Sequence, residues 1–266
     1  MELKKLGSGR TAEVFNWNEG TVLKLFYPDT DEGLVNNEYT IVKNVETLAI
    51  KAPKAHGMTK VEQRLGIVYD RLDGELMIDT IALKPYKIAH TAREMAKTHL
   101  VIHGQHTEKL PTFKRKLHQT ISASALDKPS KEKLLALLEN ISDETCVCHG
   151  DFHPGNLIKQ DGAYHTFDWV NAGKGHPLLD VARTEIMLKM AVLPAELGKI
   201  QKLIIAFMRA RFLSVYLKTY FRKSPYHKKE LDKFRPVMLA QRLTENLPER
   251  EKEKISKVLA DELKEL

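Results

Sequence analysis

The sequence predicts an α+β fold with two lobes, a small N-terminal lobe rich in β-strands and a larger, mainly helical C-terminal lobe. Short strand-like segments separated by turns, with one helix, fill residues 1–71, whereas helical periodicity dominates after residue 75. A polar turn at residues 70–74 separates the two patterns. We therefore expect lobes of residues 1–71 and 72–266.

The composition is that of an ordinary globular protein with a substantial core. The chain has 266 residues, of which 42% are hydrophobic and 29% are charged. Its formal net charge of +7 suits ligands that carry phosphate but does not demonstrate nucleic-acid binding. No apolar run is long enough to span a bilayer, and residues 1–5 lack the hydrophobic segment of a signal peptide. We expect a cytoplasmic protein with no membrane partner and no nucleic-acid partner.

The two cysteines, Cys146 and Cys148, flank Val147 just before a polar loop. Structural zinc sites normally draw on two separated ligand pairs, and the sequence offers no second pair. Positions i and i+2 of a strand are also poorly placed for a disulfide. We expect both cysteines to be small apolar residues of a buried strand that leads into the loop.

That loop, HGDFHPGN at residues 149–156, carries the strongest motif, and Asp168 follows it at the end of a strand. In a phosphoryl-transfer site one carboxylate accepts the proton of the attacking hydroxyl, while an amide oxygen and another carboxylate hold Mg²⁺ against the nucleotide phosphates. His149, Asp151 and Asn156 stand at the intervals of the protein-kinase catalytic loop, with glycine at position 150 in place of arginine. A plain polar turn is the alternative, but it does not account for the isolated Asp168.

A glycine-rich hairpin, GSGRTAEV at residues 7–14, lies between strand-like segments at residues 2–6 and 13–17. Such hairpins lay backbone N–H groups over phosphates, which makes Gly7, Gly9 and Val14 candidates for nucleotide binding. Ala12 stands where the kinase pattern has its third glycine. Alone, this segment also fits an ordinary turn.

The next strand, residues 21–27, places Lys24 on one face with Val22 and Phe26 because side chains alternate across a strand. A lysine among apolar neighbours is costly unless its ammonium meets a charge, and a nucleotide phosphate would supply one. Val22 and Val14 would then form an apolar roof over the base. A surface lysine whose ammonium reaches solvent is the alternative.

A helix is expected from an N-cap among residues 29–31 to residue 48. Its apolar stripe would contain Leu34, Ile41, Val45 and Leu48, and Glu38 falls on the same stripe. Because an inward carboxylate needs a cation, we pair Glu38 with Lys24. Strands at residues 61–69 and the turn after them complete the lobe, with Asp70 and Leu72 in the hinge that would bind the adenine edge.

Helices are expected at residues 89–103 and 131–140, with breaks at Pro85, Gly104, Pro111 and Pro129. The pair His99 and His103 lacks the glutamate of a zinc-binding helix and is interpreted as structural. A hairpin closed by residues 161–162 follows the loop.

Three further helices are expected, one opening at residue 178, one at residues 201–220 and one, facing solvent, at residues 249–266. In the first, Asp180 is expected to hold the loop backbone by hydrogen bonds. The second would carry Ile204 and Phe207 among its apolar residues. Basic residues at 222–235 are interpreted as a solvated face rather than an RNA surface.

Taken together, HGDFHPGN, then FDWVNAGKGHPLLDVAR, with GSGRTAEV and a strand lysine upstream, resemble the aminoglycoside phosphotransferase and choline-kinase-like family. The resemblance implies a two-lobed protein-kinase-like fold and a small-molecule kinase that uses ATP or GTP with Mg²⁺. It implies that Asp151 is the catalytic base and that Asn156 and Asp168 are the magnesium ligands. Lys24 would contact the nucleotide phosphates, with Glu38 orienting it. The resemblance further implies that His149 braces the loop.

The functional hypothesis is transfer of a terminal phosphoryl group to a hydroxyl of a small metabolite or antibiotic, by a monomer or homodimer. The excess of Lys and Arg between residues 209 and 242 favours a neutral or weakly charged acceptor over a polycationic one. Two alternatives are a catalytically silent nucleotide-binding or scaffold protein of the same fold and an RNA-associated kinase, which would bind RNA in a salt-sensitive manner.

Overall fold

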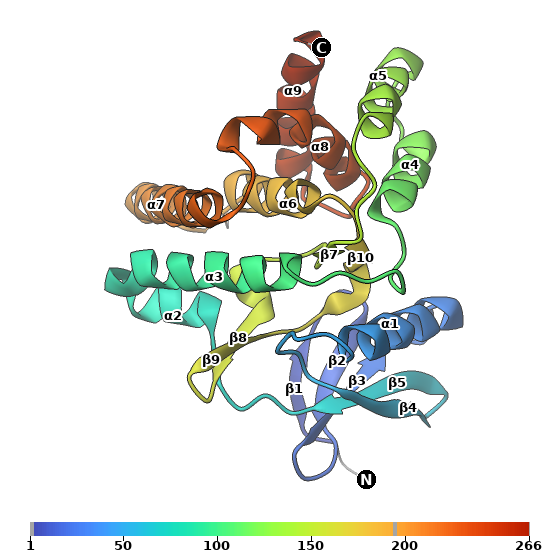
Figure 1. The fold of residues 1–266 in the computed structure, drawn as a ribbon. Helices are drawn as coiled ribbons and strands as arrows, with labels where there is room; N and C mark the ends of the chain where they lie inside the picture. The colour runs from blue at the N-terminus through green and yellow to red at the C-terminus, as the bar shows by residue number, and fades with distance from the viewer. Residues whose placement is uncertain (1–2, 194–195, 266) are drawn as a thin grey trace. The chain divides into compact units, whose positions relative to one another are not determined.

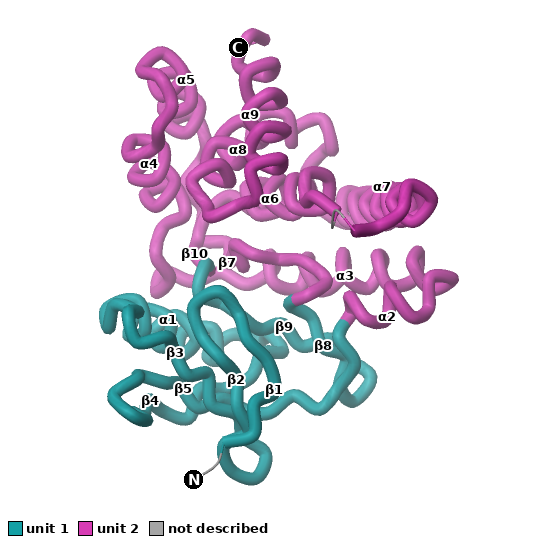
Figure 2. Tube along the Cα trace, turned by 180° about the vertical axis from the view of Figure 1, so that it is seen from behind, with its two compact units in different colours: residues 1–76, 156–171 teal, residues 77–155, 172–266 magenta. Residues whose placement is uncertain are grey.

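The structure is a computed structural model that describes residues 3–193 and 196–265, and these divide into two units (Figure 2). Unit 1 contains Met1–Leu76 and Asn156–Asn171, and unit 2 contains Met77–Gly155 and Ala172–Leu266. The hairpin after the polar loop therefore groups with the N-terminal strands. The expected lobe boundary at residue 71 stays a prediction.

The main sheet of unit 1 has the order β1-β2-β3-β5-β4, with antiparallel neighbours (Figure 1). Its strands are β1 (Lys5–Ser8), β2 (Ala12–Asn16), β3 (Thr21–Phe26), β4 (Ala55–Val61) and β5 (Arg64–Asp70). Leu23 and Leu25 of β3 are buried, as strand alternation requires. Lys24 between them pairs in register with Val14 and Ile67.

The strands expected at residues 61–69 begin earlier than predicted, because β4 starts at Ala55. A turn with left-handed backbone at Glu62 (φ 46°) and Gln63 (φ 67°) separates β4 from β5. Gly or Asn usually occupies positions with positive φ, so Glu62 and Gln63 did not predict this turn.

Helix α1 (Glu32–Val45) begins at Asp31, whose carboxylate accepts a hydrogen bond of 3.2 Å from the Leu34 backbone N–H. Glu38, Ile41 and Val45 are buried as predicted. Leu34 was misassigned because it is 60% exposed, and Val35 takes its place in the core. Leu48 lies beyond the helix end and is only half-buried.

A second sheet of unit 1 has the order β6-β8-β9, from β6 (Glu75–Leu76), β8 (Leu157–Gln160) and β9 (Ala163–Thr166). The predicted β8–β9 hairpin is confirmed, with Asp161 (φ 49°) and Gly162 (φ 76°) in its turn. Gly74 is required beside it, because a Cβ there would meet the Lys159 carbonyl oxygen at 2.2 Å.

Unit 2 is mainly helical. Its helices before the polar loop are α2 (Met77–Leu83), η1 (Pro85–Lys87), α3 (Ile88–His103), α4 (Phe113–Ala123) and α5 (Lys128–Glu139). Those after it are α6 (Pro177–Met190), α7 (Lys199–Lys223), η4 (Lys228–Lys233), α8 (Arg235–Leu243) and α9 (Glu249–Lys264). Helices α3 and α7 lie side by side (Figures 1 and 2). Strands β7 (Val147–Cys148) and β10 (Gly173–Lys174) pair at the base of the loop.

Several expectations for unit 2 need correction. Pro129 lies in the first turn of α5, where its missing N–H costs nothing, and does not break the helix. Helix α8 was not predicted. Helix α9 is not fully solvent-facing, since Ile255, Leu259 and Leu263 are buried.

Other expectations hold. Cys146 and Cys148 are buried free thiols. No helix in the described part of the chain combines the length and apolarity needed to cross a membrane. Glu2, the first residue of the expected first strand, and Leu266, the last residue of the expected last helix, lie outside the described residues.

Candidate phosphoryl-transfer site

The ammonium of Lys24 joins two carboxylates of unit 1. Its Nζ lies 2.7 Å from Glu38 Oε1 and 3.0 Å from Asp168 Oδ1, a residue 144 positions away along the chain. The predicted Lys24–Glu38 ion pair is thus confirmed. Burial by itself would lower the pKa of Lys24, but Asp168 and Glu38 outweigh it, so that this pKa is raised and the ammonium stays charged.

Tyr69 of β5 completes this cluster and was not expected from the sequence. Its hydroxyl donates a 3.0 Å hydrogen bond to Glu38 Oε1. Burial and the Glu38 carboxylate together raise the pKa of Tyr69, so it remains a donor at neutral pH. Glu38, only 2% exposed, therefore has two partners that fix its position.

Asn156 and Asp168 lie at the same end of the β8–β9 hairpin. Leu157 pairs with Thr166, and the Phe167 N–H donates a 3.2 Å hydrogen bond to the Asn156 carbonyl oxygen. Antiparallel pairing thus sets the residue before β8 beside the residues after β9. An amide and a carboxylate are the hard oxygen donors that Mg²⁺ prefers, so these residues fit that ion.

The backbone of Asp168 has φ 63°, in the left-handed region. Asp tolerates this conformation better than bulky residues do, but it is uncommon outside glycine. Its side chain is 39% exposed although one oxygen contacts Lys24. The carboxylate therefore has accessible oxygen lone pairs in addition to its ion pair.

The glycine hairpin leaves open space above its backbone. A Cβ at Gly7 would meet nothing within 4 Å, and one at Gly9 would meet only the Ala12 carbonyl oxygen at 3.6 Å. The Gly9 N–H donates a 2.8 Å hydrogen bond to that same oxygen, which closes the turn. The fold alone does not require glycine at either position, so the missing side chains matter only if a ligand approaches. Val14 and Val22 are half-buried on adjacent strands.

Of the two expected hinge residues, Asp70 uses its side chain for contacts within unit 1. Its Oδ2 accepts a 3.0 Å hydrogen bond from the Lys54 N–H, and its Oδ1 lies 2.6 Å from His56 Nε2. Its backbone N–H donates a 3.0 Å hydrogen bond to the Lys54 carbonyl oxygen, so the side chain and the N–H of Asp70 are both engaged within unit 1. Leu72 is half-buried.

In unit 2, Asp180 holds the polar loop as expected. Its carboxylate accepts hydrogen bonds from the backbone N–H groups of His149, at 2.6 Å, and Gly150, at 3.0 Å. His149 is fully buried, and its Nδ1 accepts a 3.2 Å hydrogen bond from the Asp151 N–H. Gly150 has φ 76°, a conformation that an arginine would occupy at a cost.

Asp180 also lies at the centre of a buried network that sequence reasoning missed. Its Oδ2 is 3.1 Å from His99 Nε2 and 3.3 Å from His103 Nε2. The hydroxyls of Tyr216 and Tyr220 lie 2.6 and 2.7 Å from the Nδ1 atoms of His99 and His103, respectively.

The distances, the pKa of His99 and the acceptor-only carboxylate together show which nitrogen of His99 carries the proton. Burial lowers the pKa of His99 to about 3, so this ring is neutral at pH 7. A carboxylate only accepts hydrogen bonds, so Nε2 of His99 carries the proton and Nδ1 accepts from Tyr216. Burial would raise the pKa of Asp180, but His99 and His103 outweigh it and lower this pKa. One ligand atom from each of His99, His103 and Asp180 lies within 4.8 Å of the others, close enough for the three to hold a metal ion, so the interpretation of the histidine pair as structural stays a prediction.

The carboxylate of Asp151 has two neighbours in unit 2. His153 Nε2 lies 3.6 Å from its Oδ2, and Arg183 Nη2 lies 3.4 Å from its Oδ1. Arg183 also contacts Glu245 at 2.7 Å and donates to Gln241. Burial would raise the pKa of Asp151, but the hydrogen bond with His153 and the charge of Arg183 lower it, so the carboxylate is ionised at neutral pH.

Lys116 of α4 adds a second cation to this neighbourhood. Although Lys116 keeps contact with solvent, partial desolvation by the surrounding protein and the charge of Arg183 lower its pKa, whereas Glu245 and Asp151 oppose that change. The roles of Arg183 and Lys116 were not assigned from the sequence. The sequence does contain a signal for Arg183. It follows Asp180 by three residues in the same motif, and residues three positions apart lie on the same face of a helix. Lys116 has no such signal.

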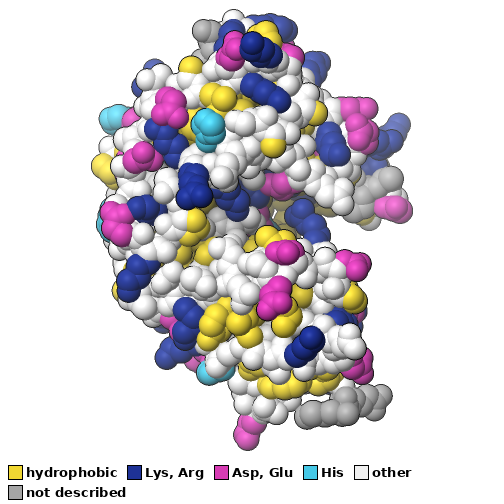
Figure 3. All heavy atoms as spheres, turned by 90° about the vertical axis from the view of Figure 1, so that its right-hand side faces the viewer, with side chains coloured by type: hydrophobic (Ala, Val, Ile, Leu, Met, Phe, Trp, Pro, Cys, Tyr) yellow, Lys and Arg dark blue, Asp and Glu magenta, His cyan; other side chains and the backbone are white. Residues whose placement is uncertain are grey.

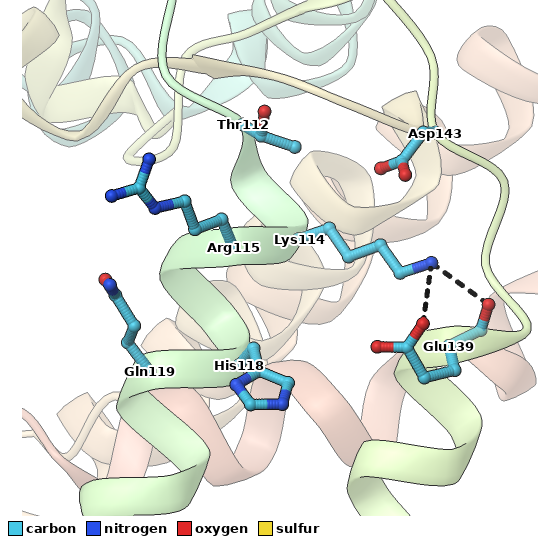
Figure 4. A pocket seen from close by; sticks show the side chains of 7 residues that line it. All are labelled: Thr112, Lys114, Arg115, His118, Gln119, Glu139 and Asp143. Atoms are coloured by element: carbon cyan, nitrogen blue, oxygen red, sulfur yellow. Dashed lines mark hydrogen bonds and ion pairs between the residues drawn. The ribbon is translucent and has the colours of Figure 1, made fainter.

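A shallow hollow elsewhere in unit 2 does not belong to this site (Figure 4). Its volume is about 400 Å³, and it lies between α4 and the end of α5. Lys114 crosses it to reach the carboxylate and the backbone oxygen of Glu139. The lining includes none of the residues expected to bind nucleotide or metal.

Comparison with known structures defines the class of fold. A crystal structure of aminoglycoside phosphotransferase APH(4)-Ia matches with a TM-score of 0.67 at 14% identity, covering 99% of this chain and 93% of that one. A choline/ethanolamine kinase family protein from Mesorhizobium loti matches with a TM-score of 0.62 at 11% identity, covering 99% and 88%. Amicoumacin kinase hAmiN, in complex with AMP-PNP and Ca²⁺, matches with a TM-score of 0.59 at 16% identity, covering 99% and 87%. The fold is therefore kinase-like, as predicted.

The sequence pattern of the phosphotransferase enzyme family matches residues 2–199. This chain belongs to that family. No match is found among curated proteins.

Proposed function

We propose that this protein transfers the terminal phosphoryl group of ATP or GTP to a hydroxyl of a small molecule. The observation that carries the proposal is the contact of Lys24 with both Glu38 and Asp168. A buried lysine with a raised pKa is a fixed positive charge, which suits contact with phosphate oxygens. Membership of the phosphotransferase family and kinase-like relatives that bind nucleotides support it further.

Asn156 and Asp168 would hold Mg²⁺, which when bound neutralises charge on the nucleotide phosphates. Asp151 would accept a hydrogen bond from the acceptor hydroxyl and take its proton. Its low pKa makes it a weak base, so its main contribution would be to orient the hydroxyl. Asp180, through the backbone N–H groups of His149 and Gly150, would hold the loop that presents Asp151.

The acceptor is proposed to be neutral or weakly charged. Arg183 and Lys116 bring positive charge close to Asp151, and a polycationic acceptor would be repelled by both. A neutral sugar or an amino alcohol meets less repulsion. Retained Lys24, Asp151, Asn156 and Asp168 argue against the catalytically silent alternative.

The test compares two aspartates of one hairpin. Asp168→Asn keeps a residue that tolerates positive φ but removes a metal-binding charge, so turnover should fall by at least about a hundredfold. Asp161→Asn makes the same change at a residue that also has positive φ, in the exposed turn of the hairpin, and should leave turnover unchanged. The readout is consumption of Mg-ATP and Mg-GTP on a panel of hydroxyl compounds.

Full activity in the Asp168→Asn variant would refute the proposed site. Nucleotide binding by the natural protein without turnover on any acceptor would favour the silent alternative. Faster turnover of polycationic aminoglycosides than of neutral hydroxyl compounds would contradict the proposed acceptor class.

A further inference from the structure

The first half of α7 exposes a row of large apolar side chains. Ile200, Leu203, Ile204 and Phe207 are 76%, 72%, 53% and 71% exposed. Their spacing of i, i+3, i+4 and i+7 sets them along one helix face. We call these four residues the α7 stripe. Single exposed apolar residues are ordinary on protein surfaces, but several on one helix face are typical of a contact surface.

The second half of α7 explains how the helix is held while the stripe stays exposed. Phe212, Tyr216 and Tyr220 are buried, and the last two hydrogen-bond to His99 and His103 of α3. These contacts fix the helix axis. The stripe lies one to three turns before them, so it adds nothing to that anchoring, and its apolar character calls for another explanation.

The charge of α7 indicates what kind of surface the stripe would contact. Its 25 residues contain no Asp or Glu. Its basic residues are Lys199, Lys202, Arg209, Arg211, Lys218, Arg222 and Lys223. In contrast, acidic and basic side chains are mixed over the face drawn in Figure 3. Two copies of this helix packed on each other would bring like charges together, so a second copy is a poor partner. An anionic surface is complementary.

We propose that the α7 stripe docks on an anionic lipid surface. The helix would lie in the plane of the headgroups, with the stripe inserted toward the acyl chains and the exposed Lys199, Arg211 and Lys218 against lipid phosphates. Apolar side chains flanked by exposed Lys and Arg suit the headgroup region of an anionic bilayer. This contact would revise the sequence-based expectation of no membrane partner.

The test uses the full chain in sedimentation with two kinds of vesicle, phosphatidylcholine alone and phosphatidylcholine mixed with phosphatidylglycerol. Binding should be stronger to the anionic vesicles and should weaken as salt is added. The double variant Leu203→Glu/Phe207→Glu should bind anionic vesicles at least about tenfold more weakly, because charge replaces two inserted side chains. Leu34→Glu is the matched control, since Leu34 is 60% exposed on a helix of unit 1.

Three outcomes would overturn the proposal: no binding to anionic vesicles, equal binding to both kinds of vesicle, or unchanged binding by the double variant. A dimer of the natural protein in light scattering that becomes a monomer in the double variant would assign the stripe to a second copy instead. Both variants should keep their thermal unfolding midpoint, because the changed side chains are exposed. Phosphotransfer to soluble acceptors should also persist in the double variant, so this test is independent of the proposed function.

Discussion

At the scale of single residues, the proposed site depends on charges that neighbours hold in place. Lys24 is fixed by Glu38 and Asp168, and Asp151 is fixed by Arg183 and His153. The two clusters differ in how well the sequence predicts them. An inward lysine on a strand and an inward glutamate on the next helix predict each other, because each is costly alone. The partners of Asp151 are harder to predict, because the only signal for Arg183 is its position three residues after Asp180 and His153 has none.

Arg183 is expected to act as a positioning residue. Arg183→Met should lower kcat by about a hundredfold with little change in the KM for nucleotide, because a small displacement of the reacting group is costly. The pKa of Asp151, now lowered, should rise toward its usual range when Arg183 is removed. Since the carboxylate works ionised, the acid-side loss of kcat should then begin at a higher pH than in the natural protein.

Arg242→Met is the matched control for this prediction. Arg242 is buried like Arg183 and also contacts Glu245, at 2.5 Å, but its second carboxylate partner is Glu251. Both variants should lose stability, so rates are measured well below their unfolding midpoints. An unchanged pH profile in Arg183→Met would exclude a role for Arg183 in setting the pKa of Asp151.

At the scale of elements, the sequence pattern predicted those helix ends and turns that depend only on residues adjacent in the chain. The β8–β9 hairpin follows from its Asp-Gly turn, and the start of α1 follows from Asp31. Strand β4 was missed because its turn uses Glu62 and Gln63. The burial of α9 was missed because charges surround its apolar residues, and only packing against α8 shows that they are covered.

The α3–α6–α7 network could not be predicted, because its partners are far apart in sequence. His99 and Tyr216 are 117 residues apart, and His99 and Asp180 are 81 apart. No local period relates such positions. The sequence-based interpretation of the histidine pair as structural stays a prediction, and the structure adds that both histidines contact the carboxylate that holds the polar loop.

This network predicts how stability depends on pH. His99 titrates near 3 in the folded protein and near 6.5 when unfolded. Between these values the unfolded state binds the additional proton, so the free energy of unfolding should fall as pH falls from 6.5 toward 3. The slope for this one group is at most about 1.4 kcal/mol per pH unit. The lowered pKa values of His165 and His176 act in the same direction.

Urea unfolding at pH 7, 6 and 5 measures that slope. His99→Gln removes the titrating ring, so the pH dependence should become shallower even though the variant is less stable at pH 7. His118→Gln, at an exposed histidine of α4, should retain the dependence of the natural protein. Equal slopes in all three proteins would show that His99 does not control acid stability.

At the scale of the whole molecule, chain connectivity links the two units. Unit 1 is built from residues 1–76 and 156–171, and the chain passes through unit 2 between them. Lys24 comes from the first segment and Asp168 from the second, so their ion pair forms only when both segments have folded together. We therefore expect a single cooperative unfolding transition, and a ligand of unit 1 should shift the whole of it.

Mg-ATP or Mg-GTP should raise the unfolding midpoint of the full chain. At a concentration of a hundred times Kd the expected gain is about 2.7 kcal/mol, which is several degrees for a chain of this size. Lys24→Met should lower the midpoint without nucleotide, because Glu38 stays buried without its cation, and should also reduce the nucleotide-induced rise. Lys60→Met, at an exposed position of β4 in the same sheet, should change neither quantity. A full nucleotide-induced rise in Lys24→Met would show that the lysine serves only the fold, whereas two separate transitions would show that the units unfold independently.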